Sequence, residues 1–281
     1  MNYIQVIFSL NRETEWKVDL FKDSLLTIGF DSFVETQEGF EAYCPEKDFQ
    51  EESLKDIISA SELEHKEDLD YTISLIPDQN WNEVWEQTSP SVQIGENCLV
   101  RKETQETIEG IKYDIIINPR QSFGTATHPT TYMILEQLLS MQSFEGKEVM
   151  DMGCGTAVLA ILAKKMGAEY VEAIDNDKWA YENAVDNVAK NNLDIVVKQG
   201  SCESITEGKL FDIFIANINL NILTDNLHYF AKHTKPGGKL IMSGFYEDDI
   251  KELVDKTKPL GFTFLSQRLR DDWACIILKK N

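Results

Sequence analysis

The stretch Val149-Met-Asp-Met-Gly-Cys-Gly-Thr-Ala157 decides the fold of this chain. An apolar strand reaches Asp151, the turn Gly153-Cys-Gly155 follows, and a helical segment rich in Ala, Leu and Ile comes next. Glycine lets the backbone turn tightly and approach a ligand where a Cβ would collide. A second short strand at 170–174 ends in Asp175, which is placed to accept hydrogen bonds from ribose hydroxyls. This order predicts a βαβ unit that binds a nucleoside.

The same residues narrow the choice of nucleoside. A dinucleotide site expects Gly-x-Gly-x-x-Gly, but Val158 stands where the third glycine belongs. Asp151 would repel a phosphate, whereas it could hold an ammonium group directly or through water. S-adenosylmethionine, with adenosine at one end and an amino acid at the other, therefore fits better than a nicotinamide dinucleotide. A plain strand-turn-helix with glycines for packing is the alternative, which the full order of features disfavours.

Charge limits the partners that this chain can have. Its 281 residues carry a formal net charge of -21. A protein that grips nucleic acid by its phosphates needs a basic face, so no direct nucleic-acid binding is expected. An acidic surface favours a basic partner and speeds its encounter. Residues 35–70 alone hold 13 Asp or Glu and three Lys, although a solvated, solubilising face would have the same composition.

Signals for targeting, membranes and metals are missing from the sequence. No apolar run is long enough for a bilayer, and the N-terminal strand pattern lacks the basic start of a signal peptide, so a cytoplasmic protein is expected. The five cysteines are scattered without a Cys-x-x-Cys, which favours reduced thiols over a zinc site. His228 and His233 are badly spaced for a metal pair and are expected at the surface. No metal site is predicted.

Residues 1–76 are predicted to form a small N-terminal α+β domain. Its strand and helix patterns fall at 3–9, 14–28, 33–36, 40–43, 48–59 and 70–75. The order β-α-β-β-α-β is that of a ferredoxin-like module. This module has no catalytic constellation, and its expected task is recognition. Residues 77–91 are predicted to form a linker helix, in which Trp81 and Trp85 share one face and pack between the domains.

Residues 92–281 are predicted to form an α/β catalytic domain that binds the cofactor. Two strands are expected first, at 92–101 and 111–117. Strand and helix patterns then alternate at 147–152, 156–166, 170–174, 178–191, 195–199, 211–216, 220–234, 239–243, 247–257, 262–269 and 273–279. Such alternation predicts a doubly wound, mostly parallel sheet of seven strands covered on both faces. The last two strands should form an antiparallel hairpin, which is the architecture of class I methyltransferases.

Two further segments carry polar groups that suit a cofactor site. Within 118–131, Pro129 fits the first turn of a helix, whose free N–H groups suit an anion together with the hydroxyls of Thr130 and Thr131. An ordinary capped helix would explain the threonines but not the whole stretch. His128 could be a base or a loop histidine, and the second interpretation is preferred.

Asn217 lies at the carboxyl end of a predicted strand, where ligands bind in open α/β sheets. Its amide oxygen could accept a hydrogen bond from an amine and orient it toward a methyl sulfonium. Helix capping by Asn219 or Asn221 is the alternative. Both interpretations can hold, because three asparagines are present.

Together these segments resemble the ribosomal protein L-eleven methyltransferases over nearly the whole chain. The resemblance rests on Phe123-Gly-Thr-Ala-Thr-His-Pro-Thr-Thr131, Asp151-Met-Gly-Cys-Gly155, Ala173-Ile-Asp-Asn-Asp177 and Ala216-Asn-Ile218. It implies that the N-terminal domain recognises the substrate protein and that the C-terminal domain binds S-adenosylmethionine. The cofactor-binding positions that it implies are Thr131, Gly153, Asp175 and Asn217. The chain departs from the family at Ala126, where glycine is usual, and at 118–121 and 219–221.

The resemblance implies methylation of lysine side chains and an N-terminal amine of a basic ribosomal protein, the eleventh of the large subunit, each to the trimethyl state. The residues themselves add Asp151 and Gly155 to the cofactor site and make Asn217 the group that orients the amine. No residue is assigned as a base, because desolvation lowers the pKa of the amine. The alternatives are a methyltransferase acting on another protein or a small amine, and a non-catalytic adaptor that binds S-adenosylmethionine.

Overall fold

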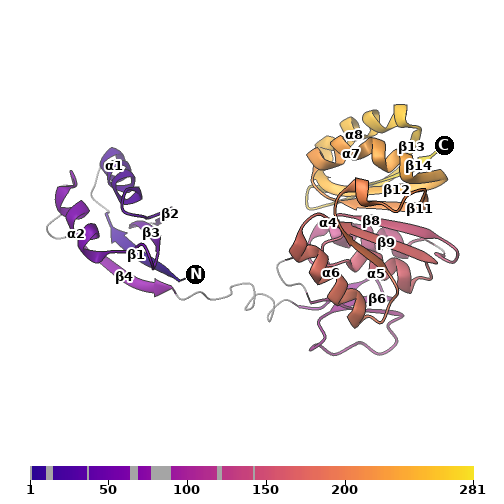
Figure 1. Cartoon of the computed structure of the whole chain (residues 1–281), viewed down its shortest axis with the longest axis horizontal. Coiled ribbons are helices and arrows are strands. Elements are labelled where there is room, and N and C mark those ends of the chain that lie inside the picture. The colour runs from indigo at the N-terminus through magenta and orange to yellow at the C-terminus, as the bar shows by residue number, and fades with distance from the viewer. Residues whose placement is uncertain are drawn as a thin grey trace. The chain divides into compact units, whose positions relative to one another are not determined.

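The computed structural model describes seven parts of the chain: residues 2–10, 15–36, 38–63, 69–76, 90–118, 122–141 and 143–281. The chain divides into two compact units, Met1–Glu83 and Val84–Asn281 (Figure 1). Each unit has a hydrophobic core of its own. Residues 77–89, which hold both tryptophans of the expected linker helix, lie outside the described residues.

The described residues of the N-terminal unit form a four-stranded antiparallel sheet with two helices. Its elements are β1 (Tyr3–Ser9), α1 (Glu15–Leu26), β2 (Ser32–Thr36), β3 (Gly39–Pro45), α2 (Glu51–Ala60) and β4 (Tyr71–Ile76). The strand order is β2-β3-β1-β4. Alternate residues of β1, such as Val6 and Phe8, are buried in one core with Phe21 of α1 and Leu54 of α2. The expected ferredoxin-like module is confirmed.

The C-terminal unit is built on a seven-stranded sheet. Its strands are β8 (Glu148–Met152), β9 (Tyr170–Asp175), β10 (Val196–Gln199), β11 (Phe211–Asn217), β12 (Thr234–Tyr246), β13 (Phe262–Arg270) and β14 (Trp273–Lys280). They lie in the order β10-β9-β8-β11-β12-β14-β13. The neighbours from β10 to β12 are parallel, and β14 is antiparallel to both β12 and β13. The predicted doubly wound sheet with its terminal hairpin is confirmed.

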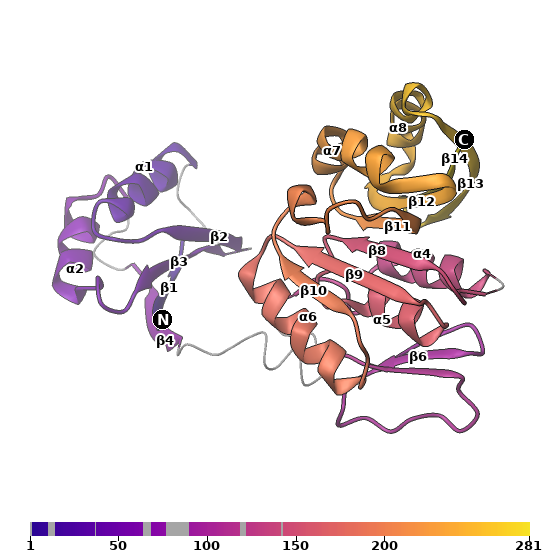
Figure 2. The same cartoon turned by 45° about the vertical axis from the view of Figure 1, so that its right-hand side comes forward.

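Helices cover both faces of this sheet (Figure 2). They are α4 (Pro129–Leu139), α5 (Val158–Lys165), α6 (Lys178–Lys190), α7 (Leu220–His233) and α8 (Ile250–Thr257). Because successive strand residues point to opposite faces, Val149 packs with α4, α5 and α6, whereas Met150 and Met152 pack with α7 and α8. Because both faces of the sheet are covered, the sequences of its strands are nearly continuous hydrophobic runs. Polar groups of the site are therefore confined to the strand ends.

Short elements complete the C-terminal unit and correct one expectation. The segment 92–101, expected as one strand, is a hairpin of β5 (Val92–Ile94) and β6 (Cys98–Arg101). Gly95 turns between them with a φ of +56°, a conformation that glycine adopts readily. β7 (Tyr113–Ile116) adds to β6 in a separate three-stranded sheet. Described 3-10 turns of this unit are η2 (Cys202–Ser204), η3 (Glu247–Asp249) and η4 (Lys258–Leu260).

The expected surface position of His233 is wrong. Its side chain is buried at the end of α7, and Nδ1 lies 3.0 Å from the carbonyl oxygen of Lys209. The histidine thus closes the end of the helix against the preceding loop. All five cysteines are buried and free, in line with the expectation of reduced thiols. None of the described helices combines the length and apolar composition needed to cross a membrane.

Candidate active site

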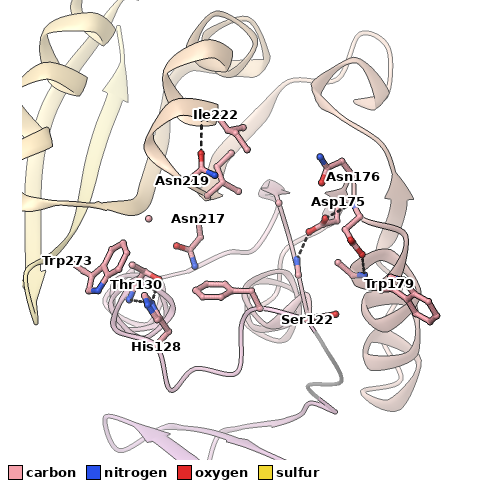
Figure 3. Close-up of a pocket in the computed structure, with 17 residues that line it drawn as sticks. Ser122, His128, Thr130, Asp175, Asn176, Trp179, Asn217, Asn219, Ile222 and Trp273 are labelled. Atoms are coloured by element: carbon pink, nitrogen blue, oxygen red, sulfur yellow. Dashed lines mark hydrogen bonds between the residues drawn. The ribbon is translucent and has the colours of Figure 1, made fainter. Parts of the chain in front are cut away.

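A cavity of about 490 Å³ opens at the carboxyl ends of β8, β9 and β11. Gly153 and Gly155 come from the loop after β8, Asp175 from the tip of β9 and Asn217 from the end of β11. Figure 3 shows Asp175 on one side, Trp273 on the other and Asn217 between them. Carboxyl ends of parallel strands meet at one edge of a sheet, so motifs far apart in sequence converge here.

Both glycines of the turn are required by the protein's own packing. Gly153 has a φ of +70°, and a Cβ there would lie 2.2 Å from Cγ2 of Ile218. Gly155 has a φ of +52°, and a Cβ there would lie 2.2 Å from the carbonyl oxygen of Phe123. From the sequence, close approach of a ligand is the expected reason for both glycines. The structure adds a second reason, since two other segments of the chain press against the turn.

Asp175 ties the turn to the tip of β9. One carboxylate oxygen accepts a hydrogen bond from the backbone N–H of Gly155 at 2.8 Å, and the other accepts from that of Asp177 at 3.0 Å. The side chain nevertheless lines the cavity. Each carboxylate oxygen can accept more than one hydrogen bond, so both oxygens retain acceptor capacity toward the cavity. This is the arrangement that a pair of vicinal hydroxyls needs.

Asn217 is held by Thr131. Its Nδ2 donates to Oγ1 of Thr131 at 3.2 Å, and Thr131 itself is fully buried. Oδ1 of Asn217 has no hydrogen-bond partner among the described residues, although the residue lines the cavity. Burying an amide oxygen without a partner is unfavourable. The oxygen is therefore an acceptor that a ligand can satisfy, while Thr131 acts as the residue that fixes the amide.

Helix capping, the alternative that the sequence offered for these asparagines, is performed by Asn219. Its side chain accepts a hydrogen bond from the backbone N–H of Ile222 at 3.1 Å and caps α7. The departure from the family at 219–221 thus contains a functional helix cap. The cap is therefore made by Asn219, and Asn217 remains free of this task.

The loop before α4 is fastened to the glycine turn. Thr156 donates from its backbone N–H to the carbonyl oxygen of Phe123 at 2.9 Å and from its hydroxyl to that of Gly124 at 2.6 Å. Ala126, in the same loop, is buried with a φ of +64°. Glycine adopts this left-handed conformation more easily than alanine, which accounts for the glycine usual in the family. Of the other departure, 118–121, only Asn118 is described.

His128 caps α4 instead of standing free as a base. Its Nδ1 accepts from the backbone N–H of Thr130 at 3.4 Å and lies 2.8 Å from the Thr130 hydroxyl. Burial lowers the pKa of His128 below its usual value. The neutral ring therefore carries its proton on Nε2. Both residues line the cavity, whereas Thr131 lies behind it.

Asp151, like Thr131, is a predicted site residue that does not line the cavity. It is fully buried at the end of β8, where one carboxylate oxygen accepts from the backbone N–H of Ala160 at 3.1 Å. The other oxygen has no partner among the described residues. Burial, with the charge of Asp175 as a smaller cause, raises the pKa of Asp151 to about 7.

Replacing Asp151 with Asn should change how stability depends on pH. The folded protein holds the Asp151 proton more tightly than the unfolded chain does, because the folded-state pKa is raised from 3.8 to about 7. The stabilisation of the folded state that results from this tighter proton binding is complete below about pH 4. It is lost as the pH rises through about 7. The free energy of unfolding of the wild type, minus that of Asp151→Asn, should therefore fall over this range, by at most about 4 kcal/mol. Urea unfolding at several pH values measures the difference, and parallel curves would contradict it.

Several residues that line the site were not predicted from the sequence. A smaller hollow of about 90 Å³ is lined by Ile174, Asn176, Ile218 and Cys202, among others. The cavity itself also includes Phe123 and Trp273. The end of β10 could have indicated Cys202, since that strand neighbours β9. Trp273 belongs to a hairpin more distant in sequence, and only the sheet order brings it here. The described residues hold no cluster of side chains able to ligate a metal.

A doubly wound sheet with a terminal hairpin, and this cavity at its switch region, define a class I S-adenosylmethionine-dependent methyltransferase. The family described as Ribosomal protein L11 methyltransferase (PrmA) matches residues 20–281. The chain belongs to this family, and its cofactor is S-adenosylmethionine.

Individual relatives agree with the family assignment. The ribosomal protein L11 methyltransferase of Phocaeicola vulgatus is 39% identical over 278 residues, which are 98% of each chain. That of Bacteroides fragilis is 36% identical over 98% of this chain and 99% of its own. A solved ribosomal protein L11 methylase from Lactobacillus delbrueckii subsp. bulgaricus gives a TM-score of 0.61 at 24% identity, covering 68% of this chain and 99% of that one. This last likeness concerns the fold.

Proposed function

We propose that this enzyme methylates amines of ribosomal protein L11, the protein that the names of its relatives give as their substrate. The observation that carries the proposal is the free Oδ1 of Asn217, an acceptor with no partner among the described residues, in the cavity of a methyltransferase. An acceptor suits a nucleophile that carries N–H groups. We further propose lysine side chains and the N-terminal amine as targets, each brought to the trimethyl state.

The residues present fit the cofactor. Asp175 would accept hydrogen bonds from the ribose hydroxyls, and the hollow beside Ile174 and Ile218, apolar in part, suits a planar base. The N-terminus of α4, with the hydroxyl of Thr130, would hold the carboxylate. Asp151 would act on the ammonium group through water, since it lies behind the cavity wall. When bound, S-adenosylmethionine supplies a methyl group on a sulfonium.

The chain contributes orientation to the reaction. A lysine ammonium, with a pKa of about 10.4 in water, has no lone pair and must lose a proton before it can attack. A cavity that excludes water lowers this pKa. Oδ1 of Asn217 would accept an N–H of the neutral unmethylated or monomethyl amine and aim its lone pair, while Thr131 keeps the amide from turning. Orientation of this kind accounts for a large rate gain without a strong base.

The N-terminal unit is proposed to select the protein substrate. It carries the acidic segment 35–70, and α2 begins with Glu51 and Glu52. Acidic groups attract a basic ribosomal protein and speed its encounter. The division of labour between the two units follows the resemblance, with recognition in one and methyl transfer in the other.

Mass spectrometry of purified L11, incubated with the full-length enzyme and isotopically labelled cofactor, tests the proposal. Labelled methyl groups on lysine and the N-terminal amine are expected. A variant lacking residues 1–76 should lose L11 methylation and retain activity on a small free amine. Equal activity of the full-length and truncated enzymes on L11 would mean that the C-terminal unit selects the substrate. Cofactor binding without any methyl transfer would favour an adaptor instead.

A further inference from the structure

Four aromatic rings form a continuous row beside Asn217. The ring centroids of Phe123 and His128 are 5.0 Å apart, those of His128 and Trp273 are 4.9 Å apart, and those of Trp273 and Tyr246 are 4.4 Å apart. They come from three separate segments: the loop before α4, the start of β14 and the end of β12. We call these four residues the aromatic wall.

Three of the four wall residues face the cavity, and Trp273 also packs partly against the core. Phe123, His128 and Trp273 line the same cavity as Asn217, and Figure 3 shows Trp273 and His128 on one side of Asn217 with Asp175 on the other. The outer members remain accessible, since Phe123 is 52% and Tyr246 is 53% exposed. Rings held in mutual contact but left open to solvent are available to a ligand.

The two ends of the cavity differ in charge. The carboxylates that line it are Asp175 and Asp177, and they adjoin each other through the hydrogen bond from Asp177 N–H to Asp175. Among the residues that the structure describes, no lysine or arginine lines the cavity, and none of the four wall residues carries a carboxylate. A cation on the Trp273 side of the cavity would therefore meet aromatic side chains. Aromatic faces attract cations, and quaternary ammonium groups above all.

We propose that the aromatic wall binds the methylated amine of the substrate and thereby sets how many methyl groups are added. This inference rests on the proposed function, in which the acceptor is an amine. Each methyl replaces an N–H, so the product ammonium is larger and less hydrated than the starting one and gains more from ring faces. The wall thus retains the partly methylated side chain for the next transfer.

The reaction balances at every round. The bond from sulfur to methyl breaks, sulfur keeps its electron pair, and the amine lone pair forms the new bond from nitrogen to carbon. The mono- or dimethylammonium then releases one proton to solvent before the next attack. After the third transfer no proton remains, and a quaternary ammonium leaves the wall.

Substitution of Trp273 tests the inference in the full chain. With peptides that carry unmethylated, monomethyl or dimethyl lysine, Trp273→Leu should raise KM for the dimethyl form roughly tenfold. It should change KM for the unmethylated form far less, so that mass spectrometry finds mono- and dimethyl products accumulating. Trp273→Phe keeps a ring and should restore much of the trimethyl product. Cofactor affinity by calorimetry should stay within about twofold of wild type, because the wall lies away from Asp175.

A second variant guards against a folding effect, because Trp273 also packs partly against the core. Tyr246→Leu changes an exposed ring of the wall and should shift the product distribution in the same direction. Phe264→Leu, an exposed ring on β13 outside the cavity, is the matched control and should leave the distribution unchanged. Equal losses for all three acceptor states would overturn the inference. Failure of the wild type to methylate any amine would overturn the proposed function itself.

Discussion

Asn217→Ala should lower kcat on L11 by roughly 10²- to 10³-fold, the loss seen when one positioned hydrogen-bonding group is removed from an active site. The substitution removes Oδ1, the acceptor with no partner among the described residues, and leaves the cavity otherwise intact. Affinity for S-adenosylmethionine should fall much less, because Asp175 and the glycine turn remain. Single-turnover kinetics measures the first effect and calorimetry the second.

Two controls make the Asn217 experiment specific. Thr131→Val removes the hydroxyl that accepts from Nδ2 but leaves Oδ1 present, so an intermediate loss of about tenfold is expected. Asn221→Ala changes an exposed asparagine of the same segment that does not line the cavity, and its turnover should match the wild type. Unchanged turnover in Asn217→Ala would remove this residue from the mechanism.

Gly155→Ala should destabilise the protein by roughly 5 kcal/mol or prevent folding, a loss at the extreme of single substitutions. The new Cβ would lie 2.2 Å from the carbonyl oxygen of Phe123, and backbone cannot move aside as a flexible side chain can. Relieving the clash would break the hydrogen bond from Thr156 N–H to the same oxygen. Chemical denaturation followed by circular dichroism measures the loss, and cofactor binding should disappear with it.

Gly95→Ala is the matched control for this clash. Gly95 has a φ of +56°, close to the +52° of Gly155, but a Cβ at Gly95 would meet nothing within 4 Å. Its substitution therefore carries only the backbone strain of the left-handed conformation, about 1 kcal/mol. The difference between the two variants isolates the close approach of the 123–131 loop. Equal losses would mean that this packing contributes little.

Local patterns in the sequence were sufficient for most of the fold. Apolar runs of strand length, separated by helical patterns, predicted the seven strands, because a strand buried on both faces must be apolar throughout. The expected single strand at 92–101 was wrong, because Gly95-Glu-Asn97 forms a turn between two short apolar segments. His233 was misjudged as well, because the carbonyl that receives it lies on another loop. Both errors concern packing or backbone geometry, which a local pattern of residues does not specify.

The sequence by itself determined which strand ends carry polar groups: Gly153, Gly155, Asp175 and Asn217 all follow or end apolar strands, and parallel strands bring such ends to one edge. Only the tertiary structure decided which of these groups line the cavity and which groups they contact. It placed Thr131 behind Asn217, Asp151 behind the cavity wall and Trp273 beside the reaction space. These positions depend on distances between segments far apart in the chain. Such distances are set by sheet order and packing, which short-range patterns of residues do not encode.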